Sequence, residues 1–320
     1  MTENLEPIRG ASPWRDAWKR LIRNKLAVFG MSLLGILIIA VIIGPSIIYW
    51  TTGYSYDYIP KDNSLVKSMP PSWTHPMGTD EAGRDLLARV LQGGRISLMV
   101  GIISTAVSLV VGVTWGAVAG YLGGFVDNLM MRIVDILYSI PYILVVIVLL
   151  AVFGGPGTPD WIAWLSEKIG GAGNQGLSQI FLLFFALGLV SWLTMARVVR
   201  GQILSLKNQD FVMAARATGV STPAIIFRHL VPNALGPVII YATLTVPTVM
   251  LTEAFLSFLG IGVQPPFASW GSLAADGIKN IAFFPWQLIA PGVTMALTLF
   301  SLNFLGDGIR DALDPQTRKF

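Results

Sequence analysis

Apolar residues in this chain gather in long stretches that contain no Asp, Glu, Lys or Arg. Six such stretches cover residues 26–56, 96–126, 136–159, 169–196, 229–252 and 280–306. Each is long enough for the roughly 20 apolar residues that a helix needs to cross about 30 Å of hydrocarbon. The stretches are continuously apolar, whereas strands of a membrane barrel alternate over about 10 residues. The pattern therefore predicts an all-α, polytopic membrane protein with six transmembrane helices.

A seventh uncharged segment, residues 254–275, does not fit a span. It is interrupted by Gly260, Gly262, Pro265, Pro266, Ser269 and Gly271. Such a segment leaves backbone groups unpaired in lipid. We expect it outside the membrane or in a re-entrant loop that protein shields.

Composition narrows the class further. The 320 residues are 53% hydrophobic and 12% charged, against about 25% charged in a typical globular domain. The absence of cysteine excludes disulfides and thiolate chemistry. The two histidines, His75 and His229, fall on predicted opposite sides of the membrane, which disfavours a metal site. The net charge of +4 follows the topology rather than a nucleic-acid surface.

The basic residues predict the orientation. With six spans, 15 of the 22 Lys and Arg residues fall on the side that holds both termini, and basic loops stay in the cytoplasm. We therefore expect both termini inside, although the first outer loop carries Arg84, Arg89 and Arg95. The first apolar stretch is too long for the core of a signal peptide, so we expect it to be retained as a span.

The chain divides into four predicted regions. Residues 1–25 form a cytoplasmic interfacial helix, 26–95 the first span with its outer loop, 96–307 a five-helix domain with a polar loop at 200–232, and 308–320 a cytoplasmic tail. In the first region Trp14, Trp18, Leu21 and Ile22 form one apolar stripe flanked by basic residues. The alternative is a helical extension of the first span.

The first outer loop ends in a short predicted helix over residues 86–91, which Gly93-Gly94 can terminate. Asp80, Glu81 and Asp85 precede this helix, with Arg84 among them. Their spacing does not fit a calcium loop, so we interpret them as capping and pairing groups.

The second stretch carries a ridge of small residues. The ridge repeats every fourth position at Ser104, Ser108, Gly112, Gly116 and Gly120. Small residues on one helix face let another helix approach closely in lipid. This helix-packing ridge predicts either the bundle core or a subunit interface.

Few ionisable residues lie in or beside the spans. Arg132 and Asp135 are three residues apart and can pair with each other. Glu253 lies about 28 Å along the fifth span at 1.5 Å per residue, near the outer surface. It either lines the outer mouth of a pathway or caps a helix.

The polar segment 200–236 lies between the fourth and fifth spans. Its first predicted helix covers 211–218, with Asp210 as cap and Gly219 at the end. A second starts at Thr222-Pro223, runs to about residue 230 and is stopped by Pro232. Ala214, Ala215 and Ala217 give a smooth face, and Phe211 and Ile226 give apolar knobs. Such a pair fits the groove of a soluble partner.

At these residues the sequence resembles ABC-importer permease subunits. The loop signature matches at Ala214-Ala215, Gly219 and Pro232, and departs at Met213, His229 and Val231. Four sequence strings are similar to those of the C-type permease of the oligopeptide/dipeptide/nickel transport family. They are A-A-R-A-x-G and R-H-x-x-P-N-A in this loop, G-T-D-E-A-G-R-D at 78–85 and L-S-F-L-G-I-G at 256–262.

The resemblance implies a type I ABC importer permease fold with cytoplasmic coupling helices in a bacterial inner or plasma membrane. It implies a second homologous permease, one or two ATP-binding cassette subunits and an extracytoplasmic solute-binding protein as partners, with lipid around the spans. The coupling loop would act through Asp210, Phe211, Ala214, Ala215, Arg216, Gly219, His229 and Pro232.

The chain contains no G-x-x-x-x-G-K-[ST] motif. We therefore expect no enzyme and no cofactor in this chain, with ATP and Mg bound by the partner ATPase subunits. Di- or oligopeptides are the first choice of cargo, and nickel chelates or other small solutes are the alternative. An ion-coupled secondary carrier is disfavoured because the spans offer it only Asp135 and Glu253.

Overall fold

The computed structural model describes residues 13–60, 68–153, 164, 175–265 and 267–313, and these are largely helical. The elements in chain order are α1 (Pro13–Arg23), α2 (Lys25–Thr52), α3 (Leu86–Leu122), α4 (Gly124–Ser139), α5 (Tyr142–Phe153), α7 (Gln175–Leu206), α8 (Asp210–Ala217), α9 (Thr222–Ala224), the π-helical η1 (Ile225–Leu230), α10 (Val231–Phe258), α11 (Trp270–Lys279) and α12 (Trp286–Leu313). The predictions for residues 1–12 and 314–320 lie outside the described residues.

The six-span helical fold is confirmed, with one span differently built. Among the described residues, five helices are long and apolar enough to cross a membrane, and α4 with α5, bent by 86° at their break, makes a sixth span when the pair is counted as one. The prediction of one span over 136–159 is therefore wrong. Ile140 ends α4 in an extended conformation, with φ −86° and ψ 131°. Pro141 contributes to this, because proline disfavours helical geometry in the residue before it.

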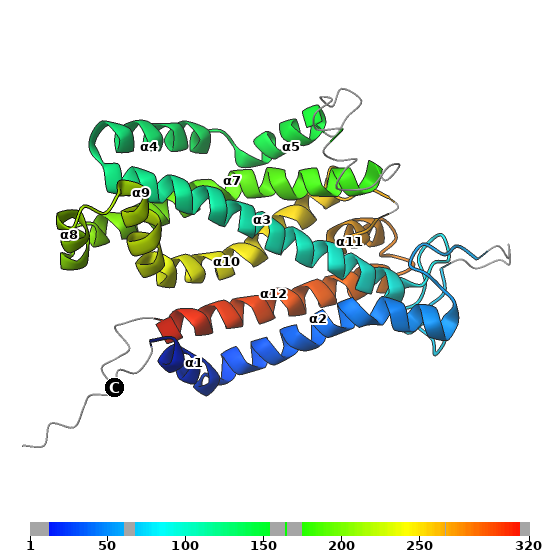
Figure 1. The fold of residues 1–320 in the computed structure, drawn as a ribbon. Coiled ribbons are helices and arrows are strands. Elements are labelled where there is room, and N and C mark those ends of the chain that lie inside the picture. Colours follow the sequence, from blue (N-terminus) through cyan, green and yellow to red (C-terminus); the bar gives the residue numbers. More distant parts are fainter. Residues whose placement is uncertain (1–12, 61–67, 154–163, 165–174, 266, 314–320) are drawn as a thin grey trace, which may run out of the picture.

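The two ends of the bundle differ (Figure 1). The helices α1, α8 and α9 lie at one end together with the last turns of α12, while α11 and the start of α3 lie at the other. The polar loop and the N-terminal helix thus share one end of the molecule, as the predicted topology requires. We name this end the inner end and the opposite one the outer end, after that predicted topology.

The helix α1 is separate from the first span. Asn24 has φ −79° and ψ 108°, and its side chain accepts hydrogen bonds from the amides of Leu26 and Ala27. It therefore caps α2 and breaks the helical path, which excludes the extension of the first span. The predicted stripe divides: Leu21 packs against α12, while Trp18 and Ile22 stay exposed.

The predicted helix end at Gly93-Gly94 is wrong, because α3 runs on through both residues. These glycines serve packing instead. A Cβ on Gly94 would lie 2.6 Å from the side chain of Val41 and 2.7 Å from that of Trp270. Their small size lets α2 and α11 approach the outer half of α3.

Residues 254–275 do not form a separate span. The first five complete α10, and Ser269 then caps the ten-residue α11. Trp270 is fully buried, and its indole N–H donates to the carbonyl of Val90 at 2.8 Å. The short helix therefore fills the outer end of the bundle as a shielded segment.

The ridge of small residues lies against α7. Ser104 donates to the carbonyl of Phe184 at 2.8 Å. A Cβ on Gly112 would lie 2.6 Å from Cβ of Met195. The ridge members Ser104, Ser108, Gly112, Gly116 and Gly120 are all buried. Within this chain they face the bundle core.

Charged residues fasten the outer end of α3. Asp80 accepts from Nε of Arg84 at 2.7 Å and is also paired with Arg89. Asp85 caps α3 by accepting from the amide of Ala88 at 2.7 Å and contacts Nδ1 of His75 at 2.7 Å. The predicted capping and pairing groups are found here.

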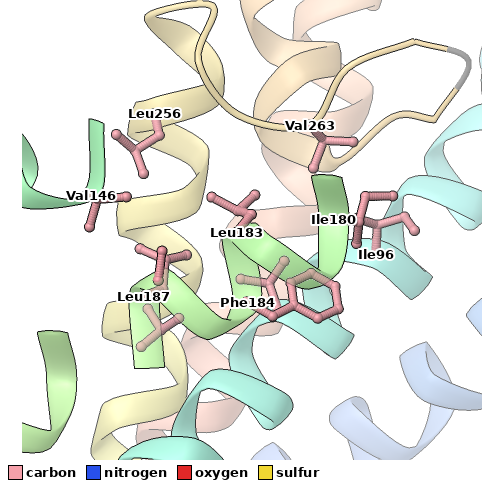
Figure 2. Packing of buried hydrophobic residues seen from close by; sticks show 11 residues of the cluster. Ile96, Val146, Ile180, Leu183, Phe184, Leu187, Leu256 and Val263 are labelled. Carbon is pink, nitrogen blue, oxygen red and sulfur yellow. The ribbon is translucent and has the colours of Figure 1, made fainter. Parts of the chain in front are cut away.

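A hydrophobic cluster holds the broken third span in place (Figure 2). Val146 of α5, Leu183 and Leu187 of α7, and Leu256 of α10 all belong to it, and Val263 reaches it from the loop after α10. This packing anchors α5 to α7 and α10. The break between α4 and α5 therefore has a fixed position beside these two helices.

Candidate functional site

The polar loop contains two surfaces, one packed on the bundle and one exposed. On the packed side, Val212 and Ala215 of α8 join a buried cluster with Ile203 of α7 and with Ile225 and Ile226 of η1. The prediction of Ile226 as an exposed knob is therefore wrong, since it is 3% exposed. It faces inward because η1 turns that side of the chain toward α8.

The exposed surface of the loop carries three large apolar side chains. Phe211, Met213 and Phe227 are 38%, 52% and 48% exposed. Ala214 and Arg216 of α8 are also exposed. Large apolar side chains exposed together at the end of a helix bundle are typical of a surface that a partner covers. We call Phe211, Met213, Ala214 and Phe227 the coupling face.

The ends of α8 differ in part from the prediction. Gln209 is its N-cap, whereas Asp210 is the first helical residue and makes no capping bond there. A carboxylate in the first turn still stabilises the helix by its dipole. Gly219 has φ +78° and follows the helix in left-handed geometry, which only glycine adopts without strain.

The second helix of the loop is not stopped by Pro232. It continues through η1 into α10, because the amide of Val231 donates to the carbonyl of Ile226 in a π-type bond. Pro232 then lies in the first turn of α10 without interrupting the helical path. His229 is half-buried in η1, and its carbonyl accepts from Asn233 at 2.6 Å. The loop is therefore joined to the fifth span without a non-helical linker.

Two cations tie the loop to the inner end of α3. Nζ of Lys207 donates to the carbonyl of Gly120 at 3.0 Å. Nε of Arg216 donates to the hydroxyl of Tyr121 at 3.2 Å, and its guanidinium lies 4.9 Å from the centre of that ring. Cations are favourable at a helix C-terminus. The loop is thus bonded to α3 as well as joined to α10.

A cavity of about 560 Å³ lies beside the break in the third span, between that break, α7 and α10. Its polar side chains carry hydroxyl groups, and among the residues that the structure describes no charged side chain lines it. The hydroxyls belong to Tyr138, Ser139, Tyr142, Ser191, Thr194, Tyr241, Thr245, Thr248 and Thr252. Such a surface offers hydrogen bonds without fixed charge, which suits a polar cargo of variable side chains.

The α10 wall of this cavity was missed by sequence reasoning. Tyr241, Thr245, Thr248 and Thr252 recur at three- and four-residue spacing and share one helix face. Thr245 donates to the carbonyl of Tyr241 at 2.8 Å and Thr252 to that of Thr248 at 2.9 Å. This stripe of hydroxyl groups within a charge-free span was the feature of the sequence that could have indicated the cavity wall.

Glu253 does not line an outer mouth, because it is 1% exposed. One carboxylate oxygen accepts from the hydroxyls of Ser257 at 2.6 Å and Ser269 at 2.7 Å. Ser269 is the cap of α11. Glu253 therefore joins the outer end of α10 to the start of α11 as a buried structural group.

The ionisable residues of the third span pair with α7 rather than with each other. Asp135 accepts from Nη2 of Arg197 at 2.8 Å, so the predicted pair of Arg132 with Asp135 is wrong. The arrangement follows from the antiparallel contact of α4 with α7. Nearer the inner end, Asp127 accepts from Nε and Nη2 of Arg200 at 2.5 and 2.7 Å.

Comparisons with known proteins agree with this architecture. Residues 112–319 match the model of the binding-protein-dependent transport system inner membrane component, and residues 12–71 match the N-terminal TM domain of oligopeptide transport permease C. A chain of the MetNI methionine ABC transporter in an inward-facing conformation superposes with a TM-score of 0.50 at 19% identity, covering 74% of this chain and 100% of that one.

Three curated relatives match over nearly the full length. The oligopeptide transport system permease protein OppC of Escherichia coli strain K12 is 45% identical, over 99% of this chain and 95% of its own. The OppC protein of Haemophilus influenzae is 44% identical, over 97% and 91%. The dipeptide transport system permease protein DppC of Bacillus subtilis is 41% identical, over 95% and 86%.

Proposed function

This chain belongs to the family of binding-protein-dependent transport system inner membrane components and is a permease subunit of a peptide importer; we propose that its loop 200–232 seats in a separate ATPase subunit. The observation that carries this proposal is the coupling face. It exposes Phe211, Met213 and Phe227 at the end of the bundle where the basic residues gather.

Closure of the ATPase would move the loop as a lever. Because α9, η1 and α10 follow one another without a non-helical linker, a displacement of the loop moves the fifth span with it. The ties from Lys207 and Arg216 carry the same movement to α3. Rigid-body shifts of this kind change which side of the membrane a pathway faces.

The remaining parts of the machine lie in other chains. We assign ATP and Mg to the ATPase subunits, because this sequence has no phosphate-binding loop of the Walker type. A second homologous permease would complete the pathway, and an extracytoplasmic solute-binding protein would deliver cargo. Both termini and the coupling loop would then be cytoplasmic, in accord with the basic residues at that end.

The cavity beside the broken third span is the part of the cargo pathway that this chain contributes. Discontinuous membrane helices commonly border substrate sites near the bilayer midplane. The hydroxyl lining fits the amide groups of a peptide backbone, which every peptide shares, rather than a particular side chain. Selection among cargoes would rest with the binding protein.

A crosslinking experiment tests the coupling face. The sequence has no cysteine, so a thiol introduced by Met213→Cys is unique in this chain. In the assembled importer we expect Met213→Cys to crosslink to an ATPase subunit. The control Val110→Cys, which is 70% exposed on the middle of α3, should not. Failure of Met213→Cys to reach an ATPase subunit in an active complex would refute the proposal.

A further inference from the structure

We propose that Arg197 is a subsite for the carboxylate of a peptide's C-terminus at the inner end of the cavity, and that Asp135 holds Arg197 between passages. The proposal rests on the proposed peptide-import function. It adds a specificity-determining residue to a cavity that has no charged side chain among its described lining residues.

The ion pair lies directly beside the cavity wall. Arg197 follows the lining residue Thr194 by three positions on α7, and Asp135 precedes the lining residue Tyr138 by three positions on α4, about one helical turn in each case. The hydroxyls of Tyr138 and Thr194 are 3.1 Å apart. The guanidinium of Arg197 lies 4.2 Å from the centre of the Tyr138 ring. Cargo leaving this wall inward therefore meets Arg197 next.

The ion pair of Arg197 with Asp135 must be in contact with water or with protein rather than with lipid. The side chains of Arg197 and Asp135 are 42% and 57% exposed. Charged groups within a span cost at least about 2.5 kcal/mol each at the bilayer centre and almost always face a bundle interior or a water-filled cavity. The adjoining cavity is the polar space that these side chains can share.

Arg197 keeps donors available for a second acceptor. Its hydrogen bond to Asp135 uses one Nη atom and one carboxylate oxygen. Nη2 carries two N–H groups, so the second of them, together with the N–H of the nitrogen beside it, remains for a second carboxylate, which the planar guanidinium binds in a forked geometry. A peptide carboxylate can thus approach Arg197 before Asp135 is displaced.

The neighbouring pair of Arg200 with Asp127 shows what a structural ion pair looks like in the same helices. Both oxygens of Asp127 accept from Arg200, and the Asp127 side chain is only 9% exposed. In that pair both carboxylate oxygens are bonded and Asp127 is shielded, although Arg200 is 34% exposed, whereas Asp135 in the pair with Arg197 is singly bonded and open. The contrast assigns cargo contact to Arg197 rather than to Arg200.

The test compares one peptide in two forms. The complete importer is reconstituted in vesicles with its ATPase and binding protein. Initial uptake is measured for a pentapeptide as free acid and as C-terminal amide, each at saturating binding protein. A hydrogen-bonded charge is worth about 1.5–3 kcal/mol, so Arg197→Gln should lower the acid-to-amide uptake ratio about tenfold. The binding protein's own preference cancels, because it is the same in every sample.

Three further variants make the result specific. Arg197→Lys keeps the charge without the fork, so its ratio should fall between those of wild type and Arg197→Gln. Asp135→Asn should keep the wild-type ratio, because Arg197 remains. Arg132→Gln removes an exposed cation one turn inward on α4 and should leave the ratio unchanged.

An equal fall of both rates in Arg197→Gln, or an unchanged ratio, would overturn the subsite and indicate a structural or interface role. If Arg197→Gln does not assemble, an unchanged ratio in Arg197→Lys overturns it. Absence of uptake of either form by the wild-type complex would instead refute peptide import itself.

Discussion

Replacing Gly112 by alanine tests whether the ridge of α3 sets the distance between α3 and α7. The added Cβ would lie 2.6 Å from Cβ of Met195 and 2.9 Å from the carbonyl oxygen of Trp192. Neither atom can move without its backbone, and Met195 is fully buried. Non-bonded heavy atoms are comfortable at about 3.5 Å, so the two helices would have to separate by roughly 1 Å.

Overpacking of this kind costs about 1–3 kcal/mol. We therefore expect Gly112→Ala to lower the melting temperature of the purified chain in detergent by several degrees. The melting temperature is measured from tryptophan fluorescence as the sample is heated. The matched control is Gly35→Ala in α2, where an added Cβ meets no atom within 4 Å. It should stay within about 1 kcal/mol of wild type. Equal melting temperatures for Gly112→Ala and wild type would refute the close α3–α7 contact.

Three further changes probe other parts of the molecule. Asp80→Ala leaves Arg89 buried without its partner and should lower the free energy of unfolding, measured by thermal melting, by about 3–5 kcal/mol. Glu81→Ala removes an exposed side chain of the same motif and should lower it by almost nothing. Equal losses in the two variants would contradict the pairing. Glu253→Ala removes the acceptor of two buried hydroxyls and should destabilise by about 1–3 kcal/mol, with unchanged melting as the contrary result. Met213→Ser should change melting little, because the side chain is 52% exposed, yet reduce peptide uptake by the assembled importer; normal uptake would remove Met213 from the coupling face.

The sequence predicted the spans well because lipid imposes a strong compositional signal. Charge-free stretches locate the helices, and the small-residue repeat of α3 has a direct physical meaning in packing. The break in the third span was missed, although Pro141 stands at it. A proline in a membrane helix is often tolerated, so residue type alone does not distinguish a kink from an 86° bend.

Pairing across helices was also beyond the sequence. Asp135 has Arg132 three residues away, which is a favourable spacing, but α7 brings Arg197 to it instead. Similarly, the burial of Glu253 depends on the loop that returns Ser269 to the end of α10. Such contacts depend on tertiary packing between segments far apart in the chain, for which local periodicity carries no signal.

The break at Pro141 has a consequence for how the cavity can evolve. A helix that ends leaves its last carbonyls without the usual amide partners, and α4 ends at the cavity wall. Two of these carbonyls are met locally, that of Ile136 by the Ser139 hydroxyl and that of Leu137 by the amide of Ile140. These acceptors belong to the main chain, so no point mutation that keeps the break deletes them. Hydroxyl side chains around them can be replaced one at a time while the cavity keeps main-chain acceptors for the amide groups of a peptide. Divergence of cargo preference would then proceed without loss of the basic ability to conduct.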